Sequence, residues 1–206
     1  MRLFLFPTIL VLLTSFQPGF SQLRYGIHAG IGINNMSDIN DPPGPFESDY
    51  YEAAMSYLFG MFGEFQLSEK FDLYTELNYE RRGANVAVFD QGEIRFNYLS
   101  LPLQLQYSLQ NDISFKLGPQ FNYLVSGISD FLPDSEVDEV YDDFDIGINL
   151  GISYPIIEKI RVAARYYHGL KPLDTLLFTE DANDPGEEFE FGRHRHWAIG
   201  VQYYLH

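Results

Sequence analysis

The chain has 206 residues, a formal net charge of −16 and no cysteine. The charge excludes nucleic acid as a partner, because phosphate binding needs clustered Lys and Arg. The lack of cysteine excludes the small secreted scaffolds that depend on disulfides. Aromatic residues make up 17% of the chain, nearly all of them Tyr and Phe, and this composition is typical of strands.

The first 21 residues have the pattern of a secretory signal peptide. Arg2 precedes an apolar run from Leu3 to Leu13, and small or turn-forming residues come before Gln22. The apolar run is shorter than the roughly 20 residues that a membrane-spanning helix requires. We predict that residues 1–21 are a cleaved signal peptide and that residues 22–206 form a single exported domain.

Eight segments of this domain alternate apolar and polar residues with a period of two. In the first, Ile27 and Ile31 share one face, while His28 and Gly30 share the other. Each segment is long enough to cross a bilayer as a tilted strand, for which about 9–11 residues suffice. The predicted strands are 23–34, 55–67, 71–82, 94–108, 112–125, 143–154, 159–169 and 193–205.

One face of these strands combines charged residues with glycines. Alternation alone also fits a soluble barrel with an apolar interior. A narrow eight-stranded lumen, however, favours small residues together with acids and bases that can pair away from water. We expect Arg161 or Arg165 to pair with acids such as Glu76 or Glu80. The expected lumen charge network is Arg24, Glu64, Glu76, Glu80, Lys116, Asp145, Arg161 and Arg165.

The connections between the predicted strands alternate between short and long. The short ones are 66–70, 109–112 and 155–158, and the long ones are 35–54, 83–93, 126–142 and 170–192. Transmembrane barrels sort their loops in this way, and the long connections here hold most of the acids. We therefore predict an all-β, eight-stranded antiparallel up-and-down transmembrane β-barrel with short periplasmic turns and long acidic extracellular loops, in the outer membrane of a Gram-negative bacterium.

Aromatic residues near the strand ends are candidates for the two girdles that mark membrane interfaces. They are Tyr25, Tyr57, Phe59, Tyr74, Tyr79, Tyr107, Tyr123, Tyr154, Tyr166, Trp197, Tyr203 and Tyr204. We expect these rings to contact outer-membrane lipid.

Few residues suggest chemistry. His194 and His196 lie two apart on a strand and are weak candidates for a metal site, but no third ligand is visible. Acyl transfer would need a nucleophile, a base and an acid: Ser126 and Ser129 are available as nucleophiles, and His168, His194 and His196 near loop acids could supply the other two. The sequence contains no G-x-S-x-G nucleophile elbow. We predict no catalytic residue and no cofactor.

Four segments resemble the PorT-like outer-membrane barrels. Residues 97–103 (NYLSLPL) are similar to the fourth-strand signature of that family, and residues 117–127, 144–151 and 166–170 resemble further strands. The resemblance implies a barrel in the outer membrane and a link to protein secretion, and it brings no catalytic residues.

Our first functional hypothesis is therefore a non-enzymatic barrel with a structural, binding or accessory role in the envelope or in protein secretion. Its acidic loops would contact envelope or secretion proteins. An outer-membrane lipid-modifying enzyme and a soluble periplasmic ligand-carrying barrel are the alternatives.

Overall fold

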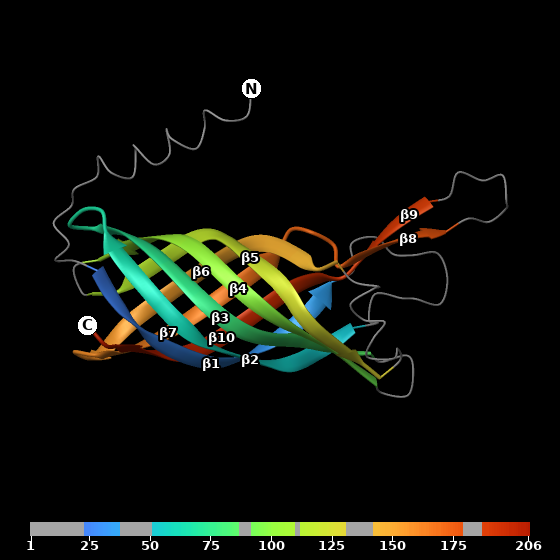
Figure 1. Ribbon diagram of the computed structural model, residues 1–206, viewed down its shortest axis with the longest axis horizontal. Coiled ribbons are helices and arrows are strands. Elements are labelled where there is room, and N and C mark those ends of the chain that lie inside the picture. The colour runs from blue at the N-terminus through green and yellow to red at the C-terminus, as the bar shows by residue number, and fades with distance from the viewer. Residues whose placement is uncertain (1–22, 38–50, 87–91, 110–111, 131–141, 179–186) are drawn as a thin grey trace, which may run out of the picture.

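Eight long antiparallel strands close into a barrel in the computed structural model (Figure 1), which describes residues 23–37, 51–86, 92–109, 112–130, 142–178 and 187–206. The barrel strands are β1 (Leu23–Ser37), β2 (Tyr51–Gln66), β3 (Phe71–Val86), β4 (Gly92–Ser108), β5 (Ser114–Ser129), β6 (Phe144–Ile157), β7 (Ile160–Gly169) and β10 (Arg193–Tyr204). Each pairs with the barrel strands before and after it in the chain, and β10 closes the barrel on β1. The predicted eight-stranded antiparallel up-and-down barrel is confirmed.

The two ends of the barrel differ. The strand ends joined by the turns from β2 to β3, from β4 to β5 and from β6 to β7 lie at one end, which we call the short-turn end; the strand ends at which the long connections begin and finish lie at the other, the long-loop end. The C-terminus lies at the short-turn end (Figure 1). The described residues contain no helix that is long and apolar enough to cross a membrane.

Several strands run further toward the long-loop end than the alternation predicts. β1 continues to Ser37, which pairs with Arg193, and β2 begins at Tyr51, which pairs with Val86. Backbone pairing needs only a neighbouring strand, so it continues past the part of each strand in which apolar and polar residues alternate.

The connection 170–192 is not a plain loop as predicted. It contains β8 (Asp174–Phe178) and β9 (Glu187–Phe191), which pair antiparallel as a separate two-stranded ribbon. The ribbon projects past the long-loop end of the barrel (Figure 1). The prediction failed because 176–178 is a short consecutive apolar run, Leu-Leu-Phe, that does not alternate.

The apolar face of the strands points outward. Ile31 and Ile199 are 62% and 60% exposed, and Leu101 and Val201 also face outward, whereas Glu76 is buried. This orientation excludes a soluble ligand-carrying barrel, because such a barrel would turn its apolar side chains inward.

Large aromatic rings fill part of the interior together with the charged residues. Tyr74 and Tyr204 are buried there, so their assignment to the girdles is wrong: Tyr74 shares the inward face with Glu76. Glycine makes room for another ring. A Cβ at Gly147 would lie 2.5 Å from the ring of Tyr167. The other girdle candidates are exposed or half-buried.

Candidate functional site in the barrel interior

A first ion-pair cluster lies near the short-turn end. The guanidinium of Arg24 lies 2.9 Å from a carboxylate oxygen of Glu64 and 3.5 Å from one of Asp72. The Tyr204 hydroxyl donates to Glu64 at 2.6 Å, and the Gln106 amide donates to Asp72 at 2.9 Å. Two carboxylates at this end are thus held by one arginine and two neutral donors.

A second cluster is centred on Arg165 of β7, in the middle of the lumen. Its two terminal nitrogens donate to the two carboxylate oxygens of Glu76 at 2.7 and 2.9 Å. Glu76 also accepts from the Tyr74 hydroxyl and from the Asn78 amide, the latter at 2.7 Å. The ring of His28 lies 3.5 Å from the same carboxylate. Glu76 is therefore held by Arg165 and by two neutral donors.

Arg82 forms the core of a third cluster, toward the long-loop end. It is fully buried, it is paired with Glu80, and it lies 3.6 Å from Asp145. The ring of Tyr167 covers it at 4.3 Å, and the Tyr167 hydroxyl donates to Asp145 at 2.8 Å. Sequence reasoning left Arg82 out of the network. Its spacing of two from Glu80 on one strand places both on the inward face and could have revealed it.

Two of the predicted network residues have no acidic partner. The Lys116 ammonium lies 3.5 Å above the ring of Tyr74 and 3.5 Å from the Gln202 side-chain oxygen, and no described carboxylate lies within 4 Å of it. Arg161 lies at the short-turn end and donates to the hydroxyl of Ser114 at 2.8 Å. Of the two arginines expected to pair with acids such as Glu76 or Glu80, Arg165 pairs with Glu76, whereas Arg161 does not, because it lies near the other end of β7.

The long-loop end of the lumen holds both candidate metal ligands. One ring nitrogen of His194 lies 3.1 Å from the Asn34 amide, and the other lies 3.1 Å from the Tyr98 hydroxyl. Both nitrogens of His194 are therefore engaged. In the part of the chain that the structure describes, no three His, Cys, Asp or Glu side chains gather as a metal site would require. A buried apolar cluster that includes Met36, Phe96 and Leu173 lies at the same end.

The candidate residues for acyl transfer lie apart. His168 points outward, toward Tyr166, whereas His196 points into the lumen. The structure instead places the Ser56 hydroxyl 2.8 Å from Nε2 of His196, a pair that sequence reasoning missed. Ser56 and His196 are 2% and 1% exposed, and Nδ1 of the histidine has no hydrogen-bond partner among the described residues. The pair lacks both the orienting acid and the access that a catalytic triad needs.

The other two candidates, Ser126 and Ser129, lie at the end of β5. Ser126 accepts a hydrogen bond of 3.0 Å from the Asn97 amide, and Ser129 is buried. Most of the acidic loop residues lie outside the described residues, and Asp130 and Asp142 are the exposed acids that border one of those segments.

The family comparison decides the class of protein. The model of the outer membrane protein beta-barrel domain matches residues 15–175. The chain belongs to this family. No curated protein matches the sequence significantly.

Two solved structures share the fold of this outer-membrane barrel. OprG from Pseudomonas aeruginosa is 13% identical, with a TM-score of 0.53, and the match covers 89% of this chain and 94% of OprG. Neisserial surface protein A is 13% identical, with a TM-score of 0.52, and the match covers 87% of this chain and 96% of that protein. At these identities the likeness extends to the fold alone.

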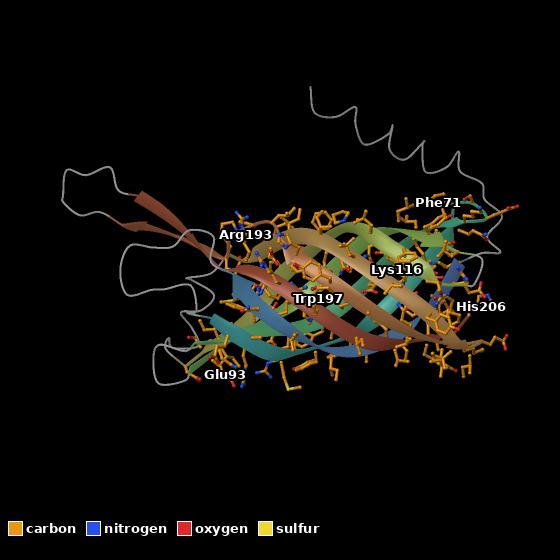
Figure 2. The ribbon with its side chains drawn as sticks, turned by 180° about the vertical axis from the view of Figure 1, so that it is seen from behind. Phe71, Glu93, Lys116, Arg193, Trp197 and His206 are labelled. Carbon is orange, nitrogen blue, oxygen red and sulfur yellow. The ribbon has the colours of Figure 1, made fainter. Side chains whose placement is uncertain are left out.

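Because the chain belongs to this family, each surface of the barrel can be assigned to lipid or to water. The outward apolar face meets the hydrocarbon of the outer membrane, the short-turn end faces the periplasm, and the long-loop end faces outward. Side chains project from the outside of the barrel along its length, with Phe71 and His206 at the short-turn end and Glu93 and Arg193 at the long-loop end (Figure 2). The interior is filled by the clusters described above, so solvent-accessible chemistry is confined to the two ends.

Proposed function

We propose that this protein is a non-enzymatic, PorT-like barrel of the outer membrane that supports the envelope or protein secretion by binding other proteins. The observation that carries the proposal is the filled lumen. Large side chains such as Arg82, Tyr74 and Tyr167 occupy it, and most of its charges form ion pairs within the lumen. An eight-stranded lumen is just wide enough for side chains to fill, so transport through it is not a function that it favours.

The long-loop end is the surface that we propose to contact partners. Residues 126–142 contain six acids and no Lys or Arg, and residues 174–191 contain seven acids and no Lys or Arg. A surface with one sign of charge speeds the encounter with a partner of opposite charge. A partner with a basic face, exposed at the cell surface or attached to the outer membrane, fits this end of the barrel.

A purification from detergent-solubilised outer membranes tests this proposal. In one variant the acids of 126–142 are changed to Asn and Gln, and in a control variant Glu69, Asp112 and Glu158 of the short-turn end are neutralised in the same way. We expect an envelope or secretion protein, identified by mass spectrometry, to co-purify with the wild type and the control but not with the loop variant. Equal recovery with both variants, or no partner with any of the three, would overturn the proposal.

The non-enzymatic part of the proposal has its own test. The pair of Ser56 and His196 is the arrangement in the described residues that comes nearest to a catalytic one. We expect cells carrying Ser56→Ala to keep the outer-membrane lipid composition of the wild type, measured by mass spectrometry against cells that lack the protein. A lipid species whose amount changes both in cells carrying Ser56→Ala and in cells that lack the protein would show that the barrel is an enzyme.

A further inference from the structure

A polar cavity of about 310 Å³ lies at the short-turn end of the barrel. Its lining comes from five barrel strands, β1 to β4 and β7, and from two of the short turns. Arg24, Asp72 and Arg161 line it from the strands, and Glu69 and Asp112 line it from the turns. The cavity is therefore the periplasmic mouth of the lumen, and it is separate from the long-loop end proposed above as the partner surface.

Arg161 stands out in this mouth because it is a buried cation without an anion. It is 8% exposed. Its guanidinium donates to the hydroxyl of Ser114 at 2.8 Å and to the backbone carbonyl of Asp112, and both acceptors are neutral. Nε has no hydrogen-bond partner, and none of the described carboxylates lies within 4 Å of the guanidinium. A buried charge of this kind is costly unless an opposite charge accompanies it.

Among the described residues, the other arginines of the lumen each lie against an acid, whereas the buried ammonium of Lys116, like Arg161, does not. Arg165 lies on the carboxylate of Glu76, and Arg82 lies on that of Glu80. Arg24, which shares the mouth with Arg161, lies against Glu64 and Asp72. Arg161 is thus the arginine of the described lumen that retains its capacity to bind a carboxylate.

The rim of the mouth carries charge of the opposite sign. Glu69 and Asp112 are exposed, and neither side chain forms a hydrogen bond or an ion pair within the described residues. A ligand seated between them and Arg161 meets a cation at depth and two carboxylates at the entrance. Nη2 of Arg161 already donates to Ser114 and Asp112, so the donors that remain for a ligand carboxylate are on Nε and Nη1, and a carboxylate on the rim attracts an ammonium group.

We propose that the periplasmic mouth binds a small zwitterionic ligand of the amino-acid or short-peptide class. Its carboxylate pairs with Arg161, and its ammonium group faces Glu69 and Asp112. The proposal is independent of the acidic loops, because the two sites lie at opposite ends of the barrel.

Titration calorimetry on the folded protein in detergent micelles tests the proposal with three probes. Tri-alanine with free termini carries both charges, tri-alanine amide lacks the carboxylate, and N-acetyl-tri-alanine lacks the ammonium group. We expect the free peptide to bind with a Kd in the millimolar range or tighter, the acetylated peptide to bind more weakly, and the amide to bind at least about tenfold more weakly than the free peptide, because it loses the charged hydrogen bonds. Equal binding of the free peptide and the amide, or no binding of any probe, would overturn the proposal.

A matched pair of variants locates the site. Arg161→Gln removes the cation but keeps an amide that can donate to Ser114, and Arg95→Gln removes an exposed arginine at the opposite end. We expect Arg161→Gln to weaken tri-alanine about tenfold or more and Arg95→Gln to leave its affinity unchanged. Unchanged affinity in Arg161→Gln would refute the site. If that variant does not fold, Arg161→Lys gives the answer, because it keeps the charge without the guanidinium donors on Nε and Nη1, and wild-type affinity in it would refute the role of those donors.

Discussion

Replacing Arg165 with Leu removes the cation that neutralises Glu76 in the middle of the lumen. The pair has two hydrogen bonds of 2.7 and 2.9 Å, and Glu76 is only 3% exposed. Removal of one partner from a buried pair costs about 3–5 kcal/mol. Glu76 keeps the Tyr74 hydroxyl, the Asn78 amide and the nearby ring of His28. We therefore expect Arg165→Leu to lower the free energy of unfolding by about 3 kcal/mol, the lower end of that range.

The assay is equilibrium unfolding by guanidinium chloride in phospholipid vesicles, followed by the fluorescence of Trp197, the one tryptophan of the sequence. Arg95→Leu is the control. It breaks a pair with Glu93 in which both side chains are about two-fifths exposed, and we expect it to cost at most about 1 kcal/mol. The double variant Arg165→Leu/Glu76→Leu should recover most of the loss, because it leaves no buried charge without its partner. A loss in Arg165→Leu no larger than in Arg95→Leu would refute the reasoning.

Three further predictions follow from the same structure. In the unfolding assay, Lys116→Met should stay within about 1 kcal/mol of the wild type or exceed it, because an unpaired buried ammonium is replaced by an apolar side chain; a loss of 3 kcal/mol would show that Lys116 is paired. Gly147→Ala should cost about 1–3 kcal/mol, since its Cβ meets the backbone carbonyl of His168 and the ring of Tyr167, and wild-type stability would contradict this close packing. On intact cells, a membrane-impermeant maleimide should label Asp130→Cys but not Glu69→Cys, and the reverse pattern would invert the barrel in the membrane.

The period-two alternation predicted the fold because successive residues of a transmembrane barrel strand face the hydrocarbon and the lumen in turn. Ile31 and Gly32 differ by one position, and one faces hydrocarbon while the other faces the lumen. The alternation of short and long connections then predicted which end of the barrel carries the short turns and which carries the long loops. Alternation says nothing about where pairing stops, however, so the extended ends of β1, β2 and β3 and the ribbon of β8 and β9 were missed.

The lumen was predicted only in part. The face of each charged residue follows from its position in the strand, so the inward placement of Glu76 and Arg165 could be read from the sequence. The sequence also predicted that Arg161 or Arg165 pairs with such acids, but not which arginine meets which acid, because that depends on how β3 and β7 lie across the barrel from each other. Tyr74 and Arg82 share the inward face by the same count of two, although Tyr74 was predicted to lie in a girdle and Arg82 was not predicted to belong to the network. Arg161 has no partner acid among the described residues because of where the folded barrel places it, and the sequence does not reveal that position.

The assignment of this protein as an outer-membrane barrel depends most on the contact between the outward face of the strands and lipid. Trp197 is 58% exposed on that face of β10, where it pairs with Ile33 of β1 and Tyr166 of β7. The direct test is quenching of Trp197 in vesicles made with phospholipids brominated along the acyl chain. We expect strong quenching of Trp197 fluorescence by the brominated lipid and almost none by iodide in the aqueous phase. Strong quenching by iodide with no effect of the brominated lipid would contradict the assignment.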